Sequence, residues 1–540
     1  MAGAESLSCK KSRHGKSLCL CSLFLTMKQS VALFAALASL LLAGCNDDGD
    51  DMEDDGSLDN DGSPQLTVME FLAADNPRLL AEDVGCSIVG DSVVECWIPS
   101  LMDGKGLVPR FTVKGDYAVC DGQRIESGES IVDFSGPKEL TVTAGSNKRT
   151  YTVIVHAFTG LPVLWIETEG RTEVTSKEEY VRASFRLVED VVTRSSGSTH
   201  ALTGQIRGHG NTTWDMPKKS FRLKLDAKAS LLGEPSDKSW VLLANYADKT
   251  MLRNMLAFRL SGISNLDYTP RSHFVEVMLN GRYNGTYQLC EKLKIDSHRV
   301  NVGDGGVLME IDERGDENVN PLNFKVGHIR NPIFIKEPEM KPDSESLAYA
   351  RNFMTTVDSV LFSEKFADPS EGWRKYMDME SFVDWYLINE IARNNDAVFF
   401  SSCYMSLPRN GRLKMGPLWD FDIAFGNVDY NDNYEPEGFW VRQEPWFDRL
   451  FQDPAFVSKV KERFAYFDSH LDEILREMNK DVQYMHRSVV ENDARWGTLY
   501  TATWPNYSVW GNYQNEVQYM KTWLVKRMEW LRLQFGETRP

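Results

Sequence analysis

The chain changes its sequence pattern at Gly160-Leu161-Pro162, and this change limits the folds that it can adopt. From residue 65 to 159, short runs rich in β-branched and aromatic residues, such as Val93–Ile98 and Tyr151–Val155, alternate with Gly, Asp, Pro and Ser. Runs of this length and spacing are typical of a small antiparallel β-sandwich. From residue 160 to 540, strand-like and helix-like runs alternate, which indicates one large α+β unit. The sequence therefore predicts an all-β domain over 65–159 and an α+β domain over 160–540.

The predicted β-sandwich resembles the immunoglobulin-like modules that often precede catalytic domains in secreted bacterial proteins. No pattern in it indicates chemistry, so we interpret it as a spacer or an adhesion module. Cys86 and Cys96 could close one loop here if they lie on adjacent strands. The five cysteines after Cys45 are an odd number without a metal-type spacing, which argues against a disulfide framework and against a zinc site.

The clearest runs of the α+β unit predict particular elements. We expect strands at Val163–Glu167, Phe221–Leu225, His273–Leu279 and Thr286–Leu289, and helices at Lys249–Ser261, Met379–Asn394, Pro454–Met478 and Asn515–Phe535. No boundary inside this unit is visible in the sequence.

The N-terminal segment has the pattern of a signal peptide. Met27–Ser30 supplies a charged start, and the apolar run Val31–Ala43 is too short to span a bilayer. The run ends in Leu42–Cys45, which resembles the lipobox of bacterial lipoproteins. That resemblance implies that Cys45 is acylated and anchors the protein to a membrane. We therefore assign residues 1–45 to an upstream segment and a lipoprotein signal peptide.

An acidic segment follows Cys45. Residues 46–64 contain nine Asp or Glu and no Lys or Arg, so we expect an extended, disordered linker. Calcium binding is the alternative, but the EF-hand spacing is absent. An acidic stretch after an acylated Cys also resembles a surface-export signal of some Gram-negative lipoproteins, which predicts a place in the cell envelope and at the outer-membrane surface. The formal charge of −18, from 60 Lys and Arg against 78 Asp and Glu, predicts no nucleic-acid partner.

A glycine-rich loop follows a strand-like run in the segment Gly204–Trp214, and Pro217–Ser220 leads into the next strand. Backbone N–H groups in such a loop can surround an anion, and a Lys at the start of the following strand can meet it. An ordinary β-hairpin turn explains the same residues, because the third glycine of a dinucleotide motif and the Lys-Ser/Thr of a P-loop are both absent. Both interpretations stay open at this point.

Two acidic clusters follow in the second half of the chain. The first is Asn394-Asn395-Asp396, at the end of a predicted helix, and the second is Asp420 and Asp422 within Gly416–Gly426. If the latter segment forms a strand, both carboxylates lie on one face and the large apolar residues on the other. Paired carboxylates of this kind suit magnesium, which also binds substrate phosphates. Each Asp taken singly could equally be a capping or salt-bridging residue.

Six motifs, in the order found here, together resemble the CotH kinase family, the spore-coat protein H-like proteins. They are Arg207–Trp214, Pro217–Phe221, Trp240–Asp248 with Leu252–Asn254, Asn280–Tyr287 with Glu291, Asn394–Asp396, and Gly416–Gly426. The resemblance spans residues 161–426. It implies an atypical protein-kinase-like fold that binds ATP and magnesium and phosphorylates Ser residues of partner proteins.

The resemblance assigns roles to the acidic residues. Asp396 would be the catalytic Asp, which accepts or orients the proton of the substrate hydroxyl, and Asn394 would assist it or the metal. Asp420 and Asp422 would hold Mg²⁺ against the ATP phosphates. Such residues suit phosphoryl transfer, which depends on positioning and on neutralising charge.

The resemblance also assigns ATP-binding groups to the glycine-rich loop, namely Arg207, Gly208, Gly210 and Asn211. We expect Lys219 to contact phosphate, with Lys218 and Lys224 as alternatives, and Glu291 to be its ion-pair partner. Together these residues predict an ATP- and Mg²⁺-dependent kinase that phosphorylates Ser or Thr residues of cell-envelope proteins.

Two other functions remain open from the sequence. The same fold could serve as a non-catalytic surface lipoprotein that binds a glycan or a protein partner, or it could transfer phosphate to a glycan or a small metabolite. The C-terminal region offers aromatic residues for such binding: Trp496, Tyr500, Trp504, Tyr507, Trp510, Tyr513, Tyr519, Trp523 and Trp530. These residues could instead pack in the core, since Trp523 and Trp530 are spaced as on one helix face. Replacement of Asp396 separates the functions, because a transferase loses turnover and a binding module keeps its ligand.

Overall fold

The computed structural model describes residues 63–80, 83–98, 104–189, 200–315 and 320–536. The predicted signal peptide, the lipidation site Cys45 and nearly all of the predicted acidic linker lie outside these ranges. Within them, no helix is both long and apolar enough to cross a membrane.

The N-terminal β-rich region consists of two sheets that share one hydrophobic core. Its strands are β1 (Gln65–Phe71), β2 (Val84–Gly85), β3 (Ser87–Val89), β4 (Val93–Ile98), β5 (Arg110–Lys114), β6 (Tyr117–Cys120), β7 (Gln123–Ile125), β8 (Lys138–Ala144) and β9 (Asn147–Ala157). The smaller sheet has the order β2-β1-β5 and the larger the order β3-β4-β9-β8-β6-β7. Leu66, Val94 and Val153 lie in the core, and Cys86 forms a disulfide with Cys96. The likeness to immunoglobulin modules stays a prediction.

A closed barrel of seven strands follows, in the order β10-β11-β12-β13-β14-β16-β15. Its strands are β10 (Val163–Thr168), β11 (Val181–Val188), β12 (His200–His209), β13 (Ser220–Ala229), β14 (Asp237–Leu243), β15 (Ser272–Leu279) and β16 (Arg282–Glu291). Alternate residues of β13, among them Phe221, Leu223 and Leu225, fill the barrel core. Asn280 and Gly281 connect β15 to β16 with φ of 52° and 77°, as tight hairpin turns require. Parallel pairing of β10 with β15 closes the barrel.

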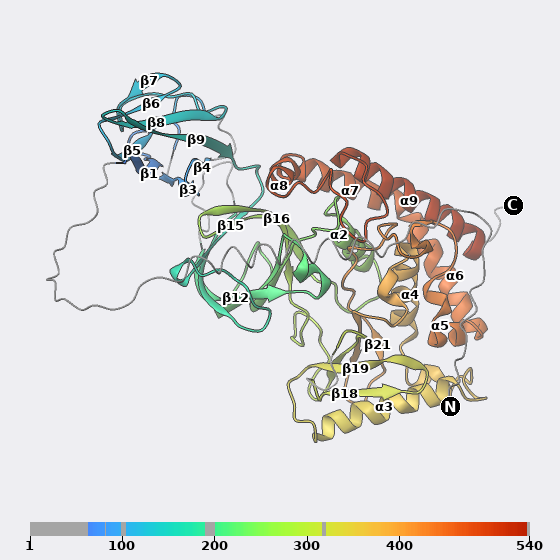
Figure 1. Cartoon of the computed structure of the whole chain (residues 1–540). Coiled ribbons are helices and arrows are strands. Elements are labelled where there is room, and N and C mark those ends of the chain that lie inside the picture. The colour runs from blue at the N-terminus through green and yellow to red at the C-terminus, as the bar shows by residue number, and fades with distance from the viewer. Residues whose placement is uncertain (1–62, 81–82, 99–103, 190–199, 316–319, 537–540) are drawn as a thin grey trace, which may run out of the picture. The chain divides into compact units, whose positions relative to one another are not determined.

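A second sheet has five strands in the order β18-β19-β17-β20-β21. They are β17 (Val307–Ile311), β18 (Asn323–Val326), β19 (Ile329–Glu337), β20 (Cys403–Leu407) and β21 (Lys414–Met415). Helix α3 (Glu345–Leu361) lies along this sheet next to β18 (Figure 1) and buries Leu347, Met354 and Val357. Ser344 caps α3 because its side chain accepts a hydrogen bond from Leu347 N.

The remaining helices form the largest core around α4 (Figure 1). They are α2 (Arg253–Gly262), α4 (Met379–Ala392), α5 (Pro445–Leu450), α6 (Pro454–Ser469), α7 (Leu471–Met485), α8 (Ser488–Trp496) and α9 (Tyr513–Phe535). Short 3-10 turns are η1 (Glu169–Arg171), η2 (Thr212–Asp215), η3 (Trp373–Lys375), η4 (Asn395–Ala397), η5 (Asp432–Tyr434) and η6 (Val441–Gln443). Helix α4 is buried nearly all round, because α2, α6 and α9 pack against it.

The predicted helix Pro454–Met478 is two helices, α6 and α7, with a break at His470. Ser469 Oγ donates to Tyr466 O at 2.7 Å, and His470 Nδ1 lies 2.8 Å from the same oxygen. These side chains compete with backbone N–H groups for that carbonyl, and α6 ends there. The other predicted helices correspond to α2, α4 and α9.

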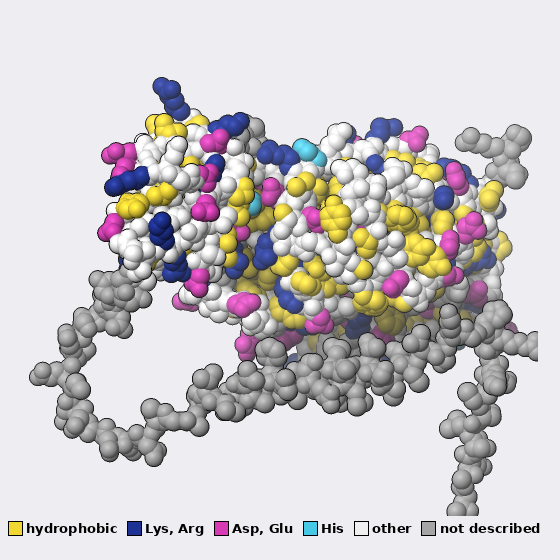
Figure 2. Space-filling model, turned by 45° about the horizontal axis from the view of Figure 1, so that its top comes forward, with side chains coloured by type: hydrophobic (Ala, Val, Ile, Leu, Met, Phe, Trp, Pro, Cys, Tyr) yellow, Lys and Arg dark blue, Asp and Glu magenta, His cyan; other side chains and the backbone are white. Residues whose placement is uncertain are grey.

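The surface carries charges of both signs. Figure 2 shows Lys and Arg side chains interspersed with Asp and Glu side chains on one face, with hydrophobic side chains between them. The formal charge of −18 is therefore not gathered into a field of one sign on this face.

Candidate functional site

A cavity of about 400 Å³ is lined by three parts of the chain. The first is the loop after β12, from Arg207 to Thr213. The second consists of strands β17 and β19 of the five-stranded sheet, and the third contains Asp396, Asp420 and Asp422. The structure thus brings the glycine-rich loop and both acidic clusters together around one space.

Asp396 lies in η4, directly after α4, and is 4% exposed. Helix α4 ends because Arg393 adopts a left-handed conformation with φ 42°. Asn394 Oδ1 accepts a hydrogen bond from Asp396 N at 3.4 Å, and Asn394 Nδ2 donates to Asn389 Oδ1 at 3.1 Å. Asn394 therefore caps the turn that carries Asp396, and its contacts are those of a positioning residue.

Asn395, to which the sequence pattern assigned no role, connects Asp396 to the loop around Tyr430. Its Nδ2 donates to Tyr430 Oη at 2.6 Å and lies 3.4 Å from Asp396 Oδ1. The side chains of Asn431 and Asn433 donate to Asn395 Oδ1. The available signal was its place beside Asp396, since amides so close to a carboxylate often orient it.

The segment Gly416–Gly426 is a loop, so the strand arrangement considered for Asp420 and Asp422 does not apply. Pro417 cannot donate to a strand ladder, and Asp420 has a φ of 68°, outside the range of strands. The side chains of Asp420 and Asp422 are nevertheless hydrogen-bonded to each other. The two carboxylates are therefore adjacent, as expected, but through a turn and not through strand alternation.

Two neighbouring residues of α2 hold this loop. Asn254 Oδ1 accepts a hydrogen bond from Phe421 N at 2.8 Å, and Arg253 Nε donates to Ala424 O at 3.0 Å. Arg253 is also ion-paired with the buried Asp248. The Leu-Arg-Asn motif of the sequence thus fixes the backbone on which the acidic pair is built.

Burial raises the pKa of Asp396 to about 6, and the charge of Asp420 adds to this effect. Burial also raises the pKa of Asp420, and burial together with the charge of Asp420 raises the pKa of Asp422 well above its usual range. Arg314 Nη2 lies 3.9 Å from Asp396 Oδ2. In the described part of the chain, no Lys or Arg nitrogen lies within 4.0 Å of Asp420 or Asp422. The acidic pair therefore lacks a protein cation.

Asp420 and Asp422 fit a magnesium ion. Mg²⁺ prefers oxygen ligands and usually takes one or two carboxylates from the protein, with waters and phosphates completing its shell. A cation between them would also favour the ionised form of both carboxyl groups, whose pKa burial raises. Among the residues that the structure describes, no group of three His, Cys, Asp or Glu side chains forms a complete metal centre. A cation that is also bound by phosphate oxygens does not require three side-chain ligands from the protein.

The loop between β12 and β13 uses glycine where a side chain has no room. A Cβ on Gly208 would lie 2.2 Å from the ring of Trp214, and one on Gly210 would lie 2.1 Å from Thr213 Oγ1. Gly210 also has a φ of 95°, which favours glycine. Since β12 and β13 are antiparallel neighbours, the loop is a hairpin connection, and with Asn211 it also lines the cavity. The hairpin interpretation is confirmed, and anion binding by the loop stays a prediction.

Arg207 lines the cavity and pairs with Arg222 across β12 and β13. The Nε atoms of both side chains are buried and have no hydrogen-bond partner among the described residues. Arg207 Nη1 lies 3.6 Å from Glu178 Oε2. Because buried donors without acceptors are costly, this wall favours an anion such as phosphate.

Lys336 on β19 is a cavity-lining cation that the sequence analysis missed. Its neighbours Ile335 and Glu337 pair with consecutive residues of β17, so Lys336 is the extra residue of a β-bulge. The bulge directs Lys336 toward Glu310 on β17, and its Nζ lies 2.6 Å from Glu310 Oε2. The signal was a lone Lys and a lone Glu within two apolar strands, where charged residues are rare.

Three lysines were predicted from the sequence as possible phosphate contacts. None of them, Lys218, Lys219 or Lys224, is among the described residues that line the cavity. Lys219 Nζ donates to a backbone carbonyl of the preceding turn η2. Lys218 is 1% exposed and donates to Asn492 Oδ1 at 2.9 Å, and burial lowers its pKa well below the ordinary value. Lys224 is exposed on β13. The cations that do line the cavity in the described chain are Lys177, Arg207, Arg314 and Lys336.

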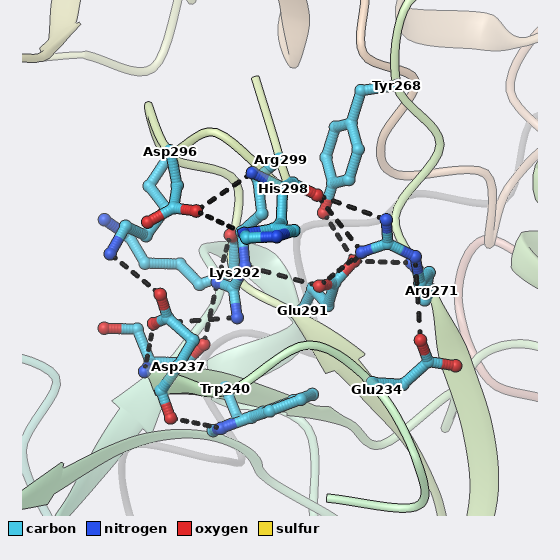
Figure 3. A network of polar contacts seen from close by, with 12 residues as sticks. Glu234, Asp237, Trp240, Tyr268, Arg271, Glu291, Lys292, Asp296, His298 and Arg299 are labelled. Carbon is cyan, nitrogen blue, oxygen red and sulfur yellow. Dashed lines mark hydrogen bonds and ion pairs between the residues drawn. The ribbon is translucent and has the colours of Figure 1, made fainter. Parts of the chain in front are cut away.

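The predicted ion pair between Lys219 and Glu291 is wrong. Glu291 belongs to a separate polar network (Figure 3), in which Arg271 Nη1 lies 2.8 Å and Arg299 Nε 3.4 Å from its Oε1. The strand register explains the separation. Glu291 pairs with Trp240 on β14, which is about four residues, or roughly 13 Å, along the strands from the level of Lys219.

The C-terminal aromatic residues divide between the core and the surface. Tyr513 and Trp523 of α9 are buried in the largest core. Trp504, in the loop before α9, is 57% exposed and lines the cavity together with Tyr430. Core packing therefore explains why α9 contains aromatic residues, but it does not explain the exposed aromatic residues of the loop before α9.

Comparison with known proteins identifies one family. The family described as CotH kinase protein matches residues 206–531, which include the glycine-rich loop and both acidic clusters. No curated protein matches the chain. One solved structure, described as a "putative glycoside hydrolase" from Bacteroides thetaiotaomicron, matches at 15% sequence identity, covering 41% of this chain and 44% of that chain with a TM-score of 0.15. A match of that quality carries no argument about fold or site.

Proposed function

Because the chain belongs to the CotH kinase family, as its motifs predicted, we propose that it transfers the γ-phosphoryl group of ATP to a Ser or Thr hydroxyl of a cell-envelope protein. One observation carries the proposal. A single cavity is lined by the buried carboxylates of Asp396, Asp420 and Asp422 and by the cationic groups of Arg207, Arg314 and Lys336, and among the described residues no Lys or Arg nitrogen lies within 4.0 Å of Asp420 or Asp422. Phosphoryl transfer uses both, since it requires a metal ion and cations that hold phosphate.

The part of the cavity that contains Arg207, Lys336 and the loop 208–211 would bind ATP. Arg207 and Lys336 would donate to phosphate oxygens, and backbone N–H groups of the loop 208–211 would add further donors. Asp420 and Asp422 would hold Mg²⁺, which when bound neutralises charge on the phosphates. Arg253 and Asn254 keep these carboxylates in place through the backbone of the loop.

Asp396 would act on the acceptor. At neutral pH a carboxyl with a pKa of about 6 is largely ionised, and it is a stronger base than an ordinary Asp. In the transfer, the hydroxyl oxygen forms a bond to the γ-phosphorus, the bond from that phosphorus to the bridging oxygen of ADP breaks, and the hydroxyl proton moves to Asp396. Asn394 and Asn395 orient the carboxylate for this step.

We further propose that the protein works as a lipoprotein of the bacterial envelope. The sequence pattern at Leu42–Cys45 and the acidic segment after it support this location. Expression with labelled palmitate tests it: the wild type should incorporate label and sediment with membranes, and Cys45→Ala should do neither. Equal labelling of both would refute acylation at Cys45.

Transfer of labelled phosphate tests the proposed activity. The purified full chain, given γ-labelled ATP, Mg²⁺ and an envelope extract, should label protein acceptors. Asp396→Asn should reduce the initial rate by about 10²-fold or more, which is the usual contribution of a general base. Asp429→Asn is the matched control, because Asp429 is exposed and does not line the cavity. No label, together with no detectable ATP binding, would refute the proposal.

A further inference from the structure

A group of stacked aromatic side chains is exposed beside the cavity. This aromatic surface consists of Tyr430, Tyr434, Trp504, Tyr507, Trp510 and Tyr519. Tyr430 stacks on Trp504 with ring centroids 5.7 Å apart, and Tyr434 stacks on Tyr507 at 4.3 Å. Tyr519 stacks on Trp510 at 4.9 Å and on Tyr507 at 6.3 Å.

The exposure of these rings is unusual. Tyr430 is 47% exposed, Trp504 57%, Tyr507 43% and Trp510 40%. Single exposed apolar side chains are common on protein surfaces. A cluster of large exposed aromatic side chains is less common and often marks a binding surface. Part of the surface of each of these rings is therefore available to a ligand.

The aromatic surface begins at the part of the cavity that contains Asp396, where the acceptor hydroxyl would lie. Tyr430 and Trp504 both line the cavity, and Tyr430 Oη accepts the hydrogen bond from Asn395 Nδ2 at 2.6 Å. Asn395 in turn contacts Asp396. A ligand lying on the rings would therefore extend away from the residue that acts on the acceptor hydroxyl.

The loop that carries the tryptophans is held in place by the core. Lys249 is buried, and its Nζ donates to Thr498 O at 2.5 Å and to Thr501 O at 2.7 Å. Asn506 Nδ2 donates to Asn427 Oδ1 at 2.9 Å, and Trp510 N donates to Glu516 at 2.7 Å. Ligands bind more tightly to preorganised groups, because less conformational entropy is lost.

The chemistry of the loop indicates what it binds. Residues 497–512 contain no Asp, Glu, Lys, Arg or His, although charged residues make up 26% of the chain. Their polar side chains are Thr, Ser, Asn and Tyr. An anionic polymer would find no cation in this loop, and the exposed Asp429, Asp432 and Glu435 beside Tyr430 and Tyr434 would repel it. The C–H faces of pyranose rings pack on flat aromatic rings, and sugar hydroxyls bond to neutral amides and hydroxyls.

We propose that the aromatic surface is a binding site for a neutral saccharide chain at the mouth of the cavity. The binding claim stands by itself, whereas the role of the saccharide in placing an acceptor next to Asp396 rests on the proposed function. The occupant is neutral and polyhydroxylated, and it is longer than one sugar, because a second group of stacked rings, Tyr434, Tyr507, Tyr519 and Trp510, includes residues only a few positions along the chain from the cavity-lining pair Tyr430 and Trp504.

Affinity electrophoresis of the full chain tests this site without ATP. Native gels would contain a mannan, a β-glucan or a galactan, and at least one should retard the wild type. Trp504→Ala and Trp510→Ala should each weaken retardation by about tenfold, as expected for loss of a buried stacking contact. Tyr484→Ala is the matched control, since Tyr484 is 51% exposed on α7. Thermal unfolding midpoints equal to wild type would show that the variants are folded.

Three results would overturn the proposal. The first is no retardation of the wild type by any of the three polymers, and the second is equal retardation of wild type and both Trp variants. The third is loss of ATP affinity in Trp504→Ala without any retardation, which would make the surface a nucleobase site. Asp396→Asn separates this proposal from the proposed activity, because it should lose transfer and keep saccharide retardation.

Discussion

The polar network around Glu291 (Figure 3) and the acidic part of the cavity contain the same types of side chain but pair them differently. In the network, Glu291 has two Arg partners, and Lys294 Nζ lies 3.0 Å from Asp237 Oδ2. In the cavity, Asp420 and Asp422 lie next to each other, and among the described residues no Lys or Arg nitrogen lies within 4.0 Å of either, although the charge of Arg314 lowers the pKa of Asp420.

The difference distinguishes acidic residues that stabilise the fold from acidic residues that bind a ligand. A buried carboxylate with its own cations is fully compensated, and removing one partner is strongly destabilising. Buried carboxylates that repel one another destabilise the empty protein, and such groups gather at functional sites because a bound cation offsets the repulsion. The comparison therefore predicts opposite consequences for similar substitutions in the two regions.

The largest effect is expected for Asp420→Asn in the cavity. It removes a proposed metal ligand, so the rate of phosphate transfer should fall by about 10³-fold, or about 4 kcal/mol in activation free energy. The unfolding midpoint should stay equal or rise, because a buried acidic group is replaced by a neutral amide. Initial rates with labelled ATP and thermal unfolding followed by circular dichroism measure the two quantities. A fall in the unfolding midpoint with normal transfer would make Asp420 a structural residue.

Glu291→Gln should show the reverse pattern. The substitution removes one of the two carboxylates beside Arg299, which is 2% exposed at its side chain, and leaves only Asp237, whose Oδ1 lies 3.6 Å from Arg299 Nη2. The free energy of unfolding should fall by about 3 kcal/mol, as for other broken buried ion pairs, and the transfer rate per folded molecule should be unchanged. Urea unfolding measures the first effect. Glu126→Gln serves as control, because Glu126 pairs with Arg124 at the surface and its loss should change little.

Lys336→Met separates the two candidate phosphate lysines. Loss of a cavity cation should raise the KM for ATP by about tenfold, the usual value of one charge-assisted hydrogen bond. Lys336→Arg should restore most of the affinity, since it keeps the charge. Lys219→Met should leave the KM within about twofold of wild type, because Lys219 does not line the cavity. A larger effect of Lys219→Met would reinstate the assignment made from the sequence.

The local sequence pattern predicted those helices and strands whose formation depends on residues close together in the chain. The runs at Val163–Glu167 and Met379–Asn394 became β10 and α4, since strand alternation and helix periodicity are properties of neighbouring residues. Closure of the barrel was not predictable in this way, because it depends on parallel pairing between Val163 and Glu276. The break at His470 was also missed, since it arises from two side chains that bond to one carbonyl.

The same limit explains the candidate site. Asp396, Asp420 and Asp422 were found because their motifs are short. The turn that joins the last two depends on Asn254, which lies 167 residues before its partner. Lys336 was missed because a bulge is a property of strand pairing and not of one strand. The Lys219–Glu291 pair failed for the same reason, since register decides which residues on a sheet are neighbours.

The smallest effect concerns His209, on the cationic side of the cavity. Burial lowers its pKa to about 4, and the charges of Arg222 and Arg207 contribute, so the folded protein keeps it neutral. The unfolded chain binds a proton there near pH 6.5, so His209 contributes stability above that pH that is lost as the pH falls from 6.5 toward 4. His209→Gln should therefore reduce the fall of the unfolding midpoint between pH 6.5 and 4. Equal profiles for His209→Gln and wild type would place His209 in contact with water in the folded protein, and the cavity would then lack the low-polarity wall that strengthens its charged groups.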